Sequence, residues 1–227
     1  MIHLAALALA ILAAPAQAPD AAPAAAPAVP VPAAPAPAAT PAPVVPPAPR
    51  PGTVRVTIVT ALGPVLIELE RDKAPVTVAN FLRYVDAKRF DNTAFYRAMK
   101  LGETAGLVQG GVRNRTNLIF PPIPHESTAK TGLTHDDGAI SLARAEPGSG
   151  RGDFFIVIGS VPTLDANTAA TGDKLGYAVF GHVISGMDIV RRILAAPTSP
   201  TAGGAAMRGQ ILTAPVKILT ARRVRAS

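Results

Sequence analysis

The fold is decided by the stretch Val54-Arg-Val-Thr-Ile-Val-Thr60 and Val65-Leu-Ile-Glu-Leu-Glu70, two segments that flank Leu62-Gly-Pro64. Branched aliphatic residues and threonine dominate the first segment, and polar and apolar residues alternate through part of the second. Such segments favour β-strands, and the Gly-Pro pair between them favours a turn. The stretch therefore predicts an antiparallel hairpin at the start of the folded part of the chain.

Two segments further along have the spacing of amphipathic helices. Residues 77–88 place apolar side chains at i, i+3, i+4 and i+7, namely Val78, Phe81, Leu82 and Val85. Thr77 is predicted to cap this helix, because a threonine oxygen can accept from a backbone amide of the first turn. Residues 187–194 carry four apolar side chains on one face and predict a second helix.

Short β-rich runs account for the rest of the folded part, at 93–98, 107–109, 139–143, 154–158, 177–183 and 216–220. Together with the hairpin they make eight short strands, and they do not alternate with helices. This order is atypical of a doubly wound parallel sheet and typical of a closed antiparallel barrel. The predicted fold class is mainly β, an eight-stranded antiparallel barrel capped by two α-helices.

The N-terminal quarter has a different composition. More than half of the 24 Pro residues precede Gly52, in a segment made almost entirely of Ala and Pro. Residues 19–52 are therefore predicted to be a disordered, extended linker, because this composition provides neither an apolar face nor a helix-compatible backbone. Residues 53–227 are long enough to bury a core of their own and are expected to form one domain.

The first 18 residues are predicted to be a signal peptide. The apolar run Leu4–Leu12 is too short to span a bilayer, and small residues at Ala14, Ala16 and Ala18 resemble cleavage sites. The expected location is outside the cytoplasm, in the periplasm or an equivalent compartment, with no stable membrane insertion after cleavage. If the segment is not cleaved, the domain would be tethered to a membrane.

Composition also excludes several kinds of site. The chain has no Cys, which removes thiol nucleophiles and thiolate metal ligands, and its four His show no metal-ligand spacing. The net charge of +7 is scattered along the sequence, so neither nucleic acid nor another polyanion is an expected partner. With no metal, no cofactor and no covalent chemistry expected, non-covalent binding remains.

Six motifs then identify a family. The segments are Ala74-Pro-Val-Thr-Val-Ala-Asn-Phe81, Phe95-Tyr-Arg97, Gln109-Gly-Gly111, Ala139-Ile-Ser-Leu-Ala143, Asp153-Phe-Phe-Ile156 and Tyr177-Ala-Val-Phe-Gly181. In their order and approximate spacing they resemble the cyclophilin-type peptidyl-prolyl cis–trans isomerases. The resemblance runs from Thr53 to about Val224, and it implies the same barrel with two capping helices.

The resemblance also implies a site. Arg97 falls on the family's catalytic arginine, and Gln109 falls on the glutamine that binds substrate backbone. The resemblance implies further substrate-binding positions at Phe155, Leu107, Leu164, Ala143, Arg144, Tyr177 and Asp153. The implied substrates are proline-containing polypeptides, bound by a monomer that needs no cofactor.

Some positions depart from the family pattern and leave a second hypothesis open. Gly106 and Thr163 stand where the family has aromatic residues, and the family's Asn and Gln positions hold Arg144 and Asp153. One hypothesis is an exported isomerase with an altered pocket. The alternative is a binding module or chaperone on the same fold, which holds prolyl segments without accelerating their isomerisation.

Overall fold

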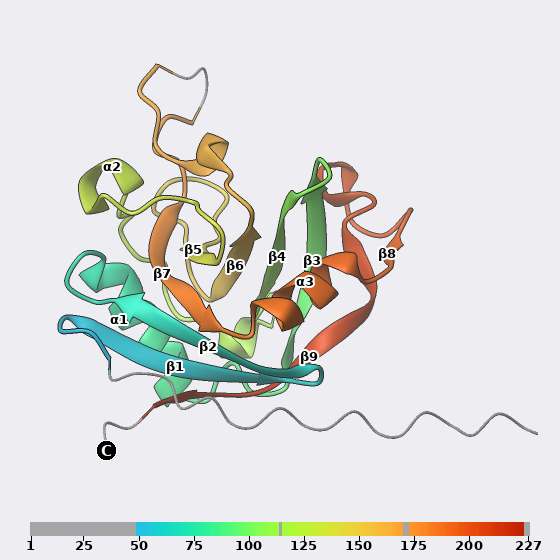
Figure 1. The fold of residues 1–227 in the computed structure, drawn as a ribbon, viewed down its shortest axis with the longest axis horizontal. Coiled ribbons are helices and arrows are strands. Elements are labelled where there is room, and N and C mark those ends of the chain that lie inside the picture. The colour runs from blue at the N-terminus through green and yellow to red at the C-terminus, as the bar shows by residue number, and fades with distance from the viewer. Residues whose placement is uncertain (1–48, 114, 170–172, 225–227) are drawn as a thin grey trace, which may run out of the picture. The chain divides into compact units, whose positions relative to one another are not determined.

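The structure, a computed structural model, describes residues 49–113, 115–169 and 173–224. The predicted signal peptide and most of the predicted linker lie outside these residues. Within them, eight strands form a closed antiparallel barrel in the order β1-β2-β7-β5-β6-β4-β3-β9, closed by pairing of β9 with β1 (Figure 1). The strands are β1 (Thr53–Thr60), β2 (Gly63–Glu70), β3 (Thr93–Leu101), β4 (Ala105–Gly111), β5 (Ala139–Leu142), β6 (Asp153–Ile158), β7 (Ala178–Ser185) and β9 (Ile211–Arg223). The predicted mainly β barrel is confirmed.

Both predicted helices are present. Helix α1 (Pro75–Asp86) packs against β2, β7 and β9, and α3 (Met187–Ala195) packs against β2, β3, β4 and β6. The sequence did not indicate a third, four-residue helix α2 (Thr128–Thr131) or the two-residue strand β8 (Thr198–Ser199), which pairs with β9. Both are too short to produce a periodic pattern. None of the helices in the described part of the chain is long and apolar enough to cross a bilayer.

The predicted cap of α1 is wrong. The N-cap residue is Ala74, without a side-chain hydrogen bond, and Thr77 lies inside the first turn. The buried carboxylate of Glu126 takes the capping role from a distant loop, accepting from the amide nitrogens of Val76 at 3.1 Å and Thr77 at 2.7 Å. It also accepts from the Thr77 hydroxyl at 2.7 Å. A negative charge at a helix N-terminus is favourable, and this one ties the loop to the barrel.

Several strands are longer than predicted, and β4 and β9 show this most clearly. Strand β4 covers residues 105–111 instead of 107–109, although three of its residues are Gly. Gly110 is required by packing, because a Cβ there would lie 2.9 Å from the Phe95 ring. Strand β9 covers 211–223 instead of 216–220, and Pro215 falls where its pairing with β3 is interrupted.

An aromatic cluster fills the barrel core. The ring of Phe154 makes edge-to-face contacts with Phe81, Phe90 and Phe95 at centroid distances of 5.4, 5.5 and 5.7 Å. All four side chains are fully buried. Phe155, next along β6, belongs to a separate apolar cluster outside the barrel core. Because successive strand residues point to opposite faces, Phe154 supports the barrel and Phe155 is available to a site.

A bulge in β3 sets the direction of Arg97. Phe95 pairs with Gly110 and Arg97 pairs with Gln109, so Tyr96 is an extra residue, and the pairing with β9 shifts at the same place. In a regular strand Arg97 would share the inward face of Phe95. The extra residue instead places Arg97 beside Gln109, on the outer face of the barrel wall.

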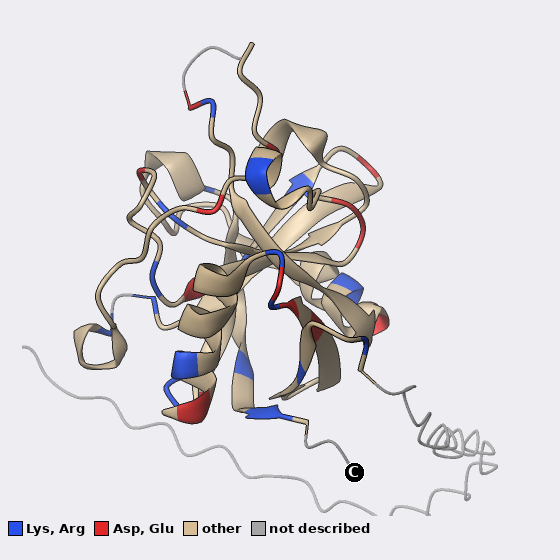
Figure 2. Ribbon diagram, turned by 90° about the vertical axis from the view of Figure 1, so that its left-hand side faces the viewer, with Lys and Arg blue, Asp and Glu red and all other residues tan. Residues whose placement is uncertain are grey.

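Basic and acidic residues are interspersed along the ribbon rather than gathered by sign (Figure 2). Several form ion pairs that join distant segments, including Arg222 with Asp91 at 2.6 Å and Arg191 with Asp137 at 2.7 Å. The bidentate pair with Arg222 holds the pKa of Asp91 below its ordinary value. A surface of mixed charge does not favour broad polyanion binding.

Candidate active site

One pocket of about 730 Å³ contains every site residue predicted from the sequence. It lies on the outer face of β3, β4 and β6. The predicted residues that line it are Arg97, Leu107, Gln109, Ala143, Arg144, Asp153, Phe155, Leu164 and Tyr177. Residues separated by as many as 80 positions are therefore neighbours, although their individual roles remain predictions.

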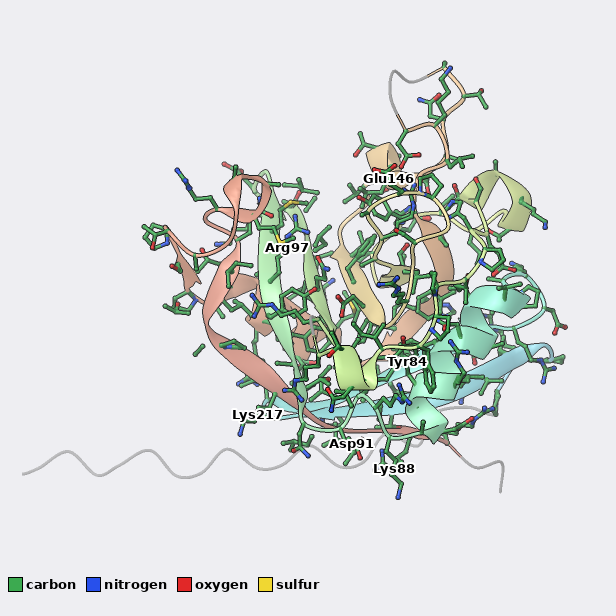
Figure 3. All side chains as sticks on the ribbon, turned by 180° about the vertical axis from the view of Figure 1, so that it is seen from behind. Tyr84, Lys88, Asp91, Arg97, Glu146 and Lys217 are labelled. Carbon is green, nitrogen blue, oxygen red and sulfur yellow. The ribbon has the colours of Figure 1, made fainter. Side chains whose placement is uncertain are left out.

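The Arg97 guanidinium is held by two glutamines. Its Nη1 donates to Gln109 Oε1 at 2.9 Å, and its Nε and Nη2 donate to Gln210 Oε1 at 2.8 and 2.6 Å. Burial in the pocket lowers the pKa of Arg97 from its ordinary value. An arginine remains cationic under these conditions, so the pocket holds a fixed and partly buried positive charge. Arg97 lies on β3 in the upper left part of the molecule in Figure 3.

Sequence reasoning missed Gln210. This residue precedes β9, 113 positions after Arg97 in the chain, and no motif surrounds it. Its backbone oxygen accepts from the Ala98 amide at 2.8 Å, which brings its side chain to the end of β3. Only the pairing of β3 with β9 creates this neighbourhood.

A hydrogen-bonded chain extends from Gln109 to Asp153. Gln109 Nε2 donates to Tyr96 Oη at 2.7 Å, and Tyr96 Oη donates to Asp153 Oδ2 at 3.3 Å. Burial raises the pKa of both Tyr96 and Asp153 above their ordinary values. Because the hydroxyl donates to the carboxylate, it accepts from the amide of Gln109, and the Gln109 oxygen then faces Arg97. Tyr96 and Asp153 thus fix the orientation of Gln109.

An apolar wall lies beside these polar groups. The rings of Phe155 and Tyr177 pack edge-to-face, with 5.3 Å between their centroids. Leu107 and Leu164 belong to the same apolar cluster as Phe155. Such a wall suits a small apolar ring, with the Arg97 charge at one side. Gly106 lies outside the lining of this pocket, and a Cβ there would meet the Met99 carbonyl oxygen at 2.6 Å.

Arg144 lines the pocket, but its guanidinium is already engaged. It donates to the Gly176 carbonyl and to Asp173, and it lies 5.0 Å from the centre of the Tyr177 ring. The side chain is 3% exposed. It therefore supports the loop that carries Tyr177, while the neighbouring backbone of Ala143 remains at the pocket surface.

The sequence also gave no indication of a buried histidine behind Phe155. The His135 ring stacks on the Phe155 ring, with 5.9 Å between the ring centroids. Its Nδ1 lies 2.6 Å from Asp165 Oδ1, and its Nε2 lies 3.1 Å from Ser141 Oγ. The arrangement looks like a Ser-His-Asp triad, but Ser141 is fully buried and cannot reach a substrate. Burial lowers the pKa of His135, so the neutral ring donates to Asp165 and accepts from Ser141. It fixes the position of Phe155 from behind.

This histidine should make stability pH-dependent. The unfolded chain binds a proton at His135 below the ordinary pKa of 6.5, whereas the folded chain resists protonation because its pKa is lower. The free energy of unfolding should therefore fall as the pH drops from 7.5 to about 5.5, by at most about 1.4 kcal/mol per pH unit below 6.5. Urea unfolding at several pH values measures this slope. His135→Gln should flatten it, and an unchanged slope in His135→Gln would contradict the assignment.

Within the described residues, no group of three or more His, Asp or Glu side chains is placed to hold a metal ion. The chemistry that the pocket can provide is a fixed cation, oriented amide groups and an apolar wall. These groups can bind and polarise a substrate without covalent bonding.

The chain is similar to proteins of known family over most of its folded part. The family model described as cyclophilin-type peptidyl-prolyl cis-trans isomerase/CLD matches residues 54–222. A peptidyl-prolyl cis-trans isomerase of Acinetobacter baylyi is 34% identical over 166 residues, which cover 73% of this chain and 82% of the relative. Peptidyl-prolyl cis-trans isomerase B of Escherichia coli is 34% identical over 145 residues, covering 61% of this chain and 82% of the relative.

A solved structure has the same fold. The cyclophilin-type isomerase of Cryptosporidium parvum, crystallised in the presence of the dipeptide Ala-Pro, has a TM-score of 0.60 and 21% identity. The match covers 76% of this chain and 99% of that protein. From its sequence match over residues 54–222 and its shared barrel, the chain belongs to the cyclophilin-type peptidyl-prolyl cis–trans isomerase family.

Proposed function

We propose that this protein accelerates rotation about X-Pro peptide bonds in polypeptides, with Arg97 as the catalytic group. The observation that carries the proposal is the Arg97 guanidinium, held by Gln109 and Gln210 beside an apolar wall of Phe155, Leu107 and Leu164. The family membership and the names of the relatives support the same activity.

The chemistry follows from the electronic structure of the amide. Rotation is slow because amide resonance must be broken, with a barrier of about 18–20 kcal/mol. In the twisted transition state the prolyl nitrogen regains a lone pair, which a planar amide does not offer. A guanidinium that donates to this nitrogen binds the transition state more tightly than the ground state, which lowers the barrier.

The surrounding residues keep one half of the amide still while the other half turns. Phe155, Leu107 and Leu164 would hold the proline ring, and Gln109 would bind backbone on the other side of the bond. Arg97 suits its task because it cannot lose its proton and its planar fork is preorganised. The two glutamines determine where this fork points before the substrate arrives.

A second function has one observation in its favour. Four of the five N–H groups of Arg97 already donate to side chains: Nη1 to Gln109, Nε to Gln210, and Nη2 to both Gln210 and Met99 Sδ. If these bonds are not exchanged for a bond to the prolyl nitrogen, the pocket would bind prolyl segments without turning them over.

NMR exchange spectroscopy on an Ala-Pro-containing peptide separates the two functions. With the full chain at catalytic concentration, we expect cis–trans exchange to become much faster than the uncatalysed process, which takes tens to hundreds of seconds. Shifted peptide signals with exchange no faster than in buffer would assign the binding function instead.

A further inference from the structure

We propose that the site selects prolyl segments that carry an acidic side chain a few residues from the proline, and that Arg113 and Arg151 make this selection. The inference rests on the proposed function and names the class of substrate. It concerns a part of the pocket that lies beyond the proline-binding wall, where the chain has placed exposed positive charge.

The two arginines continue the outer face of the barrel wall beyond the catalytic residues. On β6, Phe155 and Asp153 share this face, and Arg151 precedes Asp153 by two residues. On β4, Gln109 pairs with Phe155 and Gly111 pairs with Asp153, and Arg113 follows Gly111 by two residues. Both arginines therefore lie past the same end of the site.

The distance between this end and the proline wall matches a short peptide. At about 3.3 Å per residue, a position two to four residues from Phe155 along the strand direction lies about 7–13 Å away. A substrate that is extended across the site would span the same distance with two to four of its own residues. An acidic side chain at such a position can meet either guanidinium.

The charge at this end is only partly balanced from within the pocket, where the Arg113 guanidinium opposes the rise that burial causes in the pKa of Asp153. Both side chains are exposed, and neither forms an ion pair with the described residues. Arg144 differs, since Asp173 pairs with it. Among the described residues that line the pocket, Asp153 provides the only carboxylate, and both of its oxygens already accept hydrogen bonds.

The backbone and the guanidinium of Arg113 are both held by neighbouring groups. Its backbone has a φ of 52°, in the left-handed region that a residue with a side chain seldom adopts. The Arg113 amide donates to Asp153 Oδ1 at 2.7 Å, and its guanidinium lies 4.9 Å from the centre of the Tyr96 ring. Uncommon backbone conformations that are held by their surroundings are frequent at functional sites. Asp153 therefore orients both Gln109, through Tyr96, and this basic group.

Arg151 is anchored through its backbone as well. Its carbonyl oxygen accepts from Asn80 Nδ2 at 2.6 Å, which ties the start of β6 to helix α1. The side chain is left to extend along the pocket rim. Two anchored cations at one end of a groove favour an anionic partner at that end and disfavour a cationic one.

Matched peptides test the preference. Each peptide has one Ala-Pro bond and a single Glu, Gln or Lys placed two, three or four residues before or after the proline. Gln is the neutral control because it has the shape of Glu. At about 20 mM salt we expect kcat/KM for the Glu peptide to exceed that for the Gln peptide by about three- to tenfold in at least one placement, with Lys slowest. The ratio should approach one at about 500 mM salt, because exposed charges are screened.

Variants assign the effect to the two arginines. Arg113→Gln and Arg151→Gln should each lower the Glu-to-Gln ratio, the double variant should bring it near one, and Arg113→Lys should keep most of it. Lys130→Gln removes the same charge from an exposed position on α2, outside the pocket lining, and should leave the ratio unchanged. A wild-type ratio near one in every placement, or an unchanged ratio in the double variant, would overturn the inference.

The same experiments distinguish failure of the acidic preference from failure of the proposed isomerase activity. Turnover of all Gln and Glu peptides at equal rates would leave the isomerase intact and refute only the selection. If no peptide is turned over, the proposed function fails, and dissociation constants for the same peptides, measured by NMR titration, test the acidic preference directly. Equal affinities for Glu and Gln peptides would then refute it.

Discussion

Arg97→Ala should lower kcat/KM for a prolyl peptide by at least tenfold and by up to about a thousandfold. Loss of one preorganised donor to a developing charge or lone pair typically has an effect of this size. The effect should appear mainly in kcat, because the bond to the prolyl nitrogen exists only in the transition state. NMR exchange or a protease-coupled assay measures it.

Two controls make the result specific. The far-ultraviolet spectrum and the unfolding midpoint should change little, because Arg97 lies on the outer face of the wall and outside the aromatic core. Arg97→Lys keeps the charge but loses the planar fork and the bonds to both glutamines, so we expect it to remain severely impaired. An Arg97→Ala protein with the wild-type rate would refute the catalytic assignment.

Phe154→Ala should lower the free energy of unfolding by about 3–5 kcal/mol. Its ring contacts three buried aromatic rings, and truncation leaves a cavity that the closed barrel cannot fill by moving one element. Since small domains have a total stability of about 5–15 kcal/mol, this is a large fraction of it. Urea unfolding monitored by circular dichroism measures the change.

Leu219→Ala is the matched control, because this large apolar side chain on β9 is 42% exposed. It should change the free energy of unfolding by less than about 1 kcal/mol. Similar decreases in the free energy of unfolding of the two variants would mean that the Phe154 cluster does not make a special contribution to the stability of the core.

The fold was predictable because its signals are local. The β-rich segments 54–60 and 65–70 and the helical spacing after Pro75 each arise within about a dozen residues, and the structure has a hairpin and a helix there. The two faces of β6 were also predictable in outline, since neighbouring strand residues point in opposite directions. The predicted strand boundaries were less accurate. Gly110, for example, lies within a strand because the Phe95 ring leaves no room for a Cβ there, and the local sequence does not show this contact.

The residues that line the site were predictable from the sequence, but the residues that orient them were not. The motifs brought together nine lining residues without showing what orients them. Gln210, Glu126 and His135 act through contacts across 113, 49 and 30 positions, respectively, and each lies outside the local patterns from which sequence reasoning proceeds. Their partners become neighbours only through the pairing of β3 with β9 and the packing of loops on the barrel.

The extra residue in β3 also has an evolutionary consequence. Removal of the Tyr96 codon would restore regular alternation, in which Phe95 still faces the core and Arg97 still faces outward beside Gln109. The lost part would be the hydroxyl that connects Gln109 to Asp153. A lineage could therefore gain or lose this connection in a single in-frame step, and so change what orients Gln109 while Arg97 remains its partner.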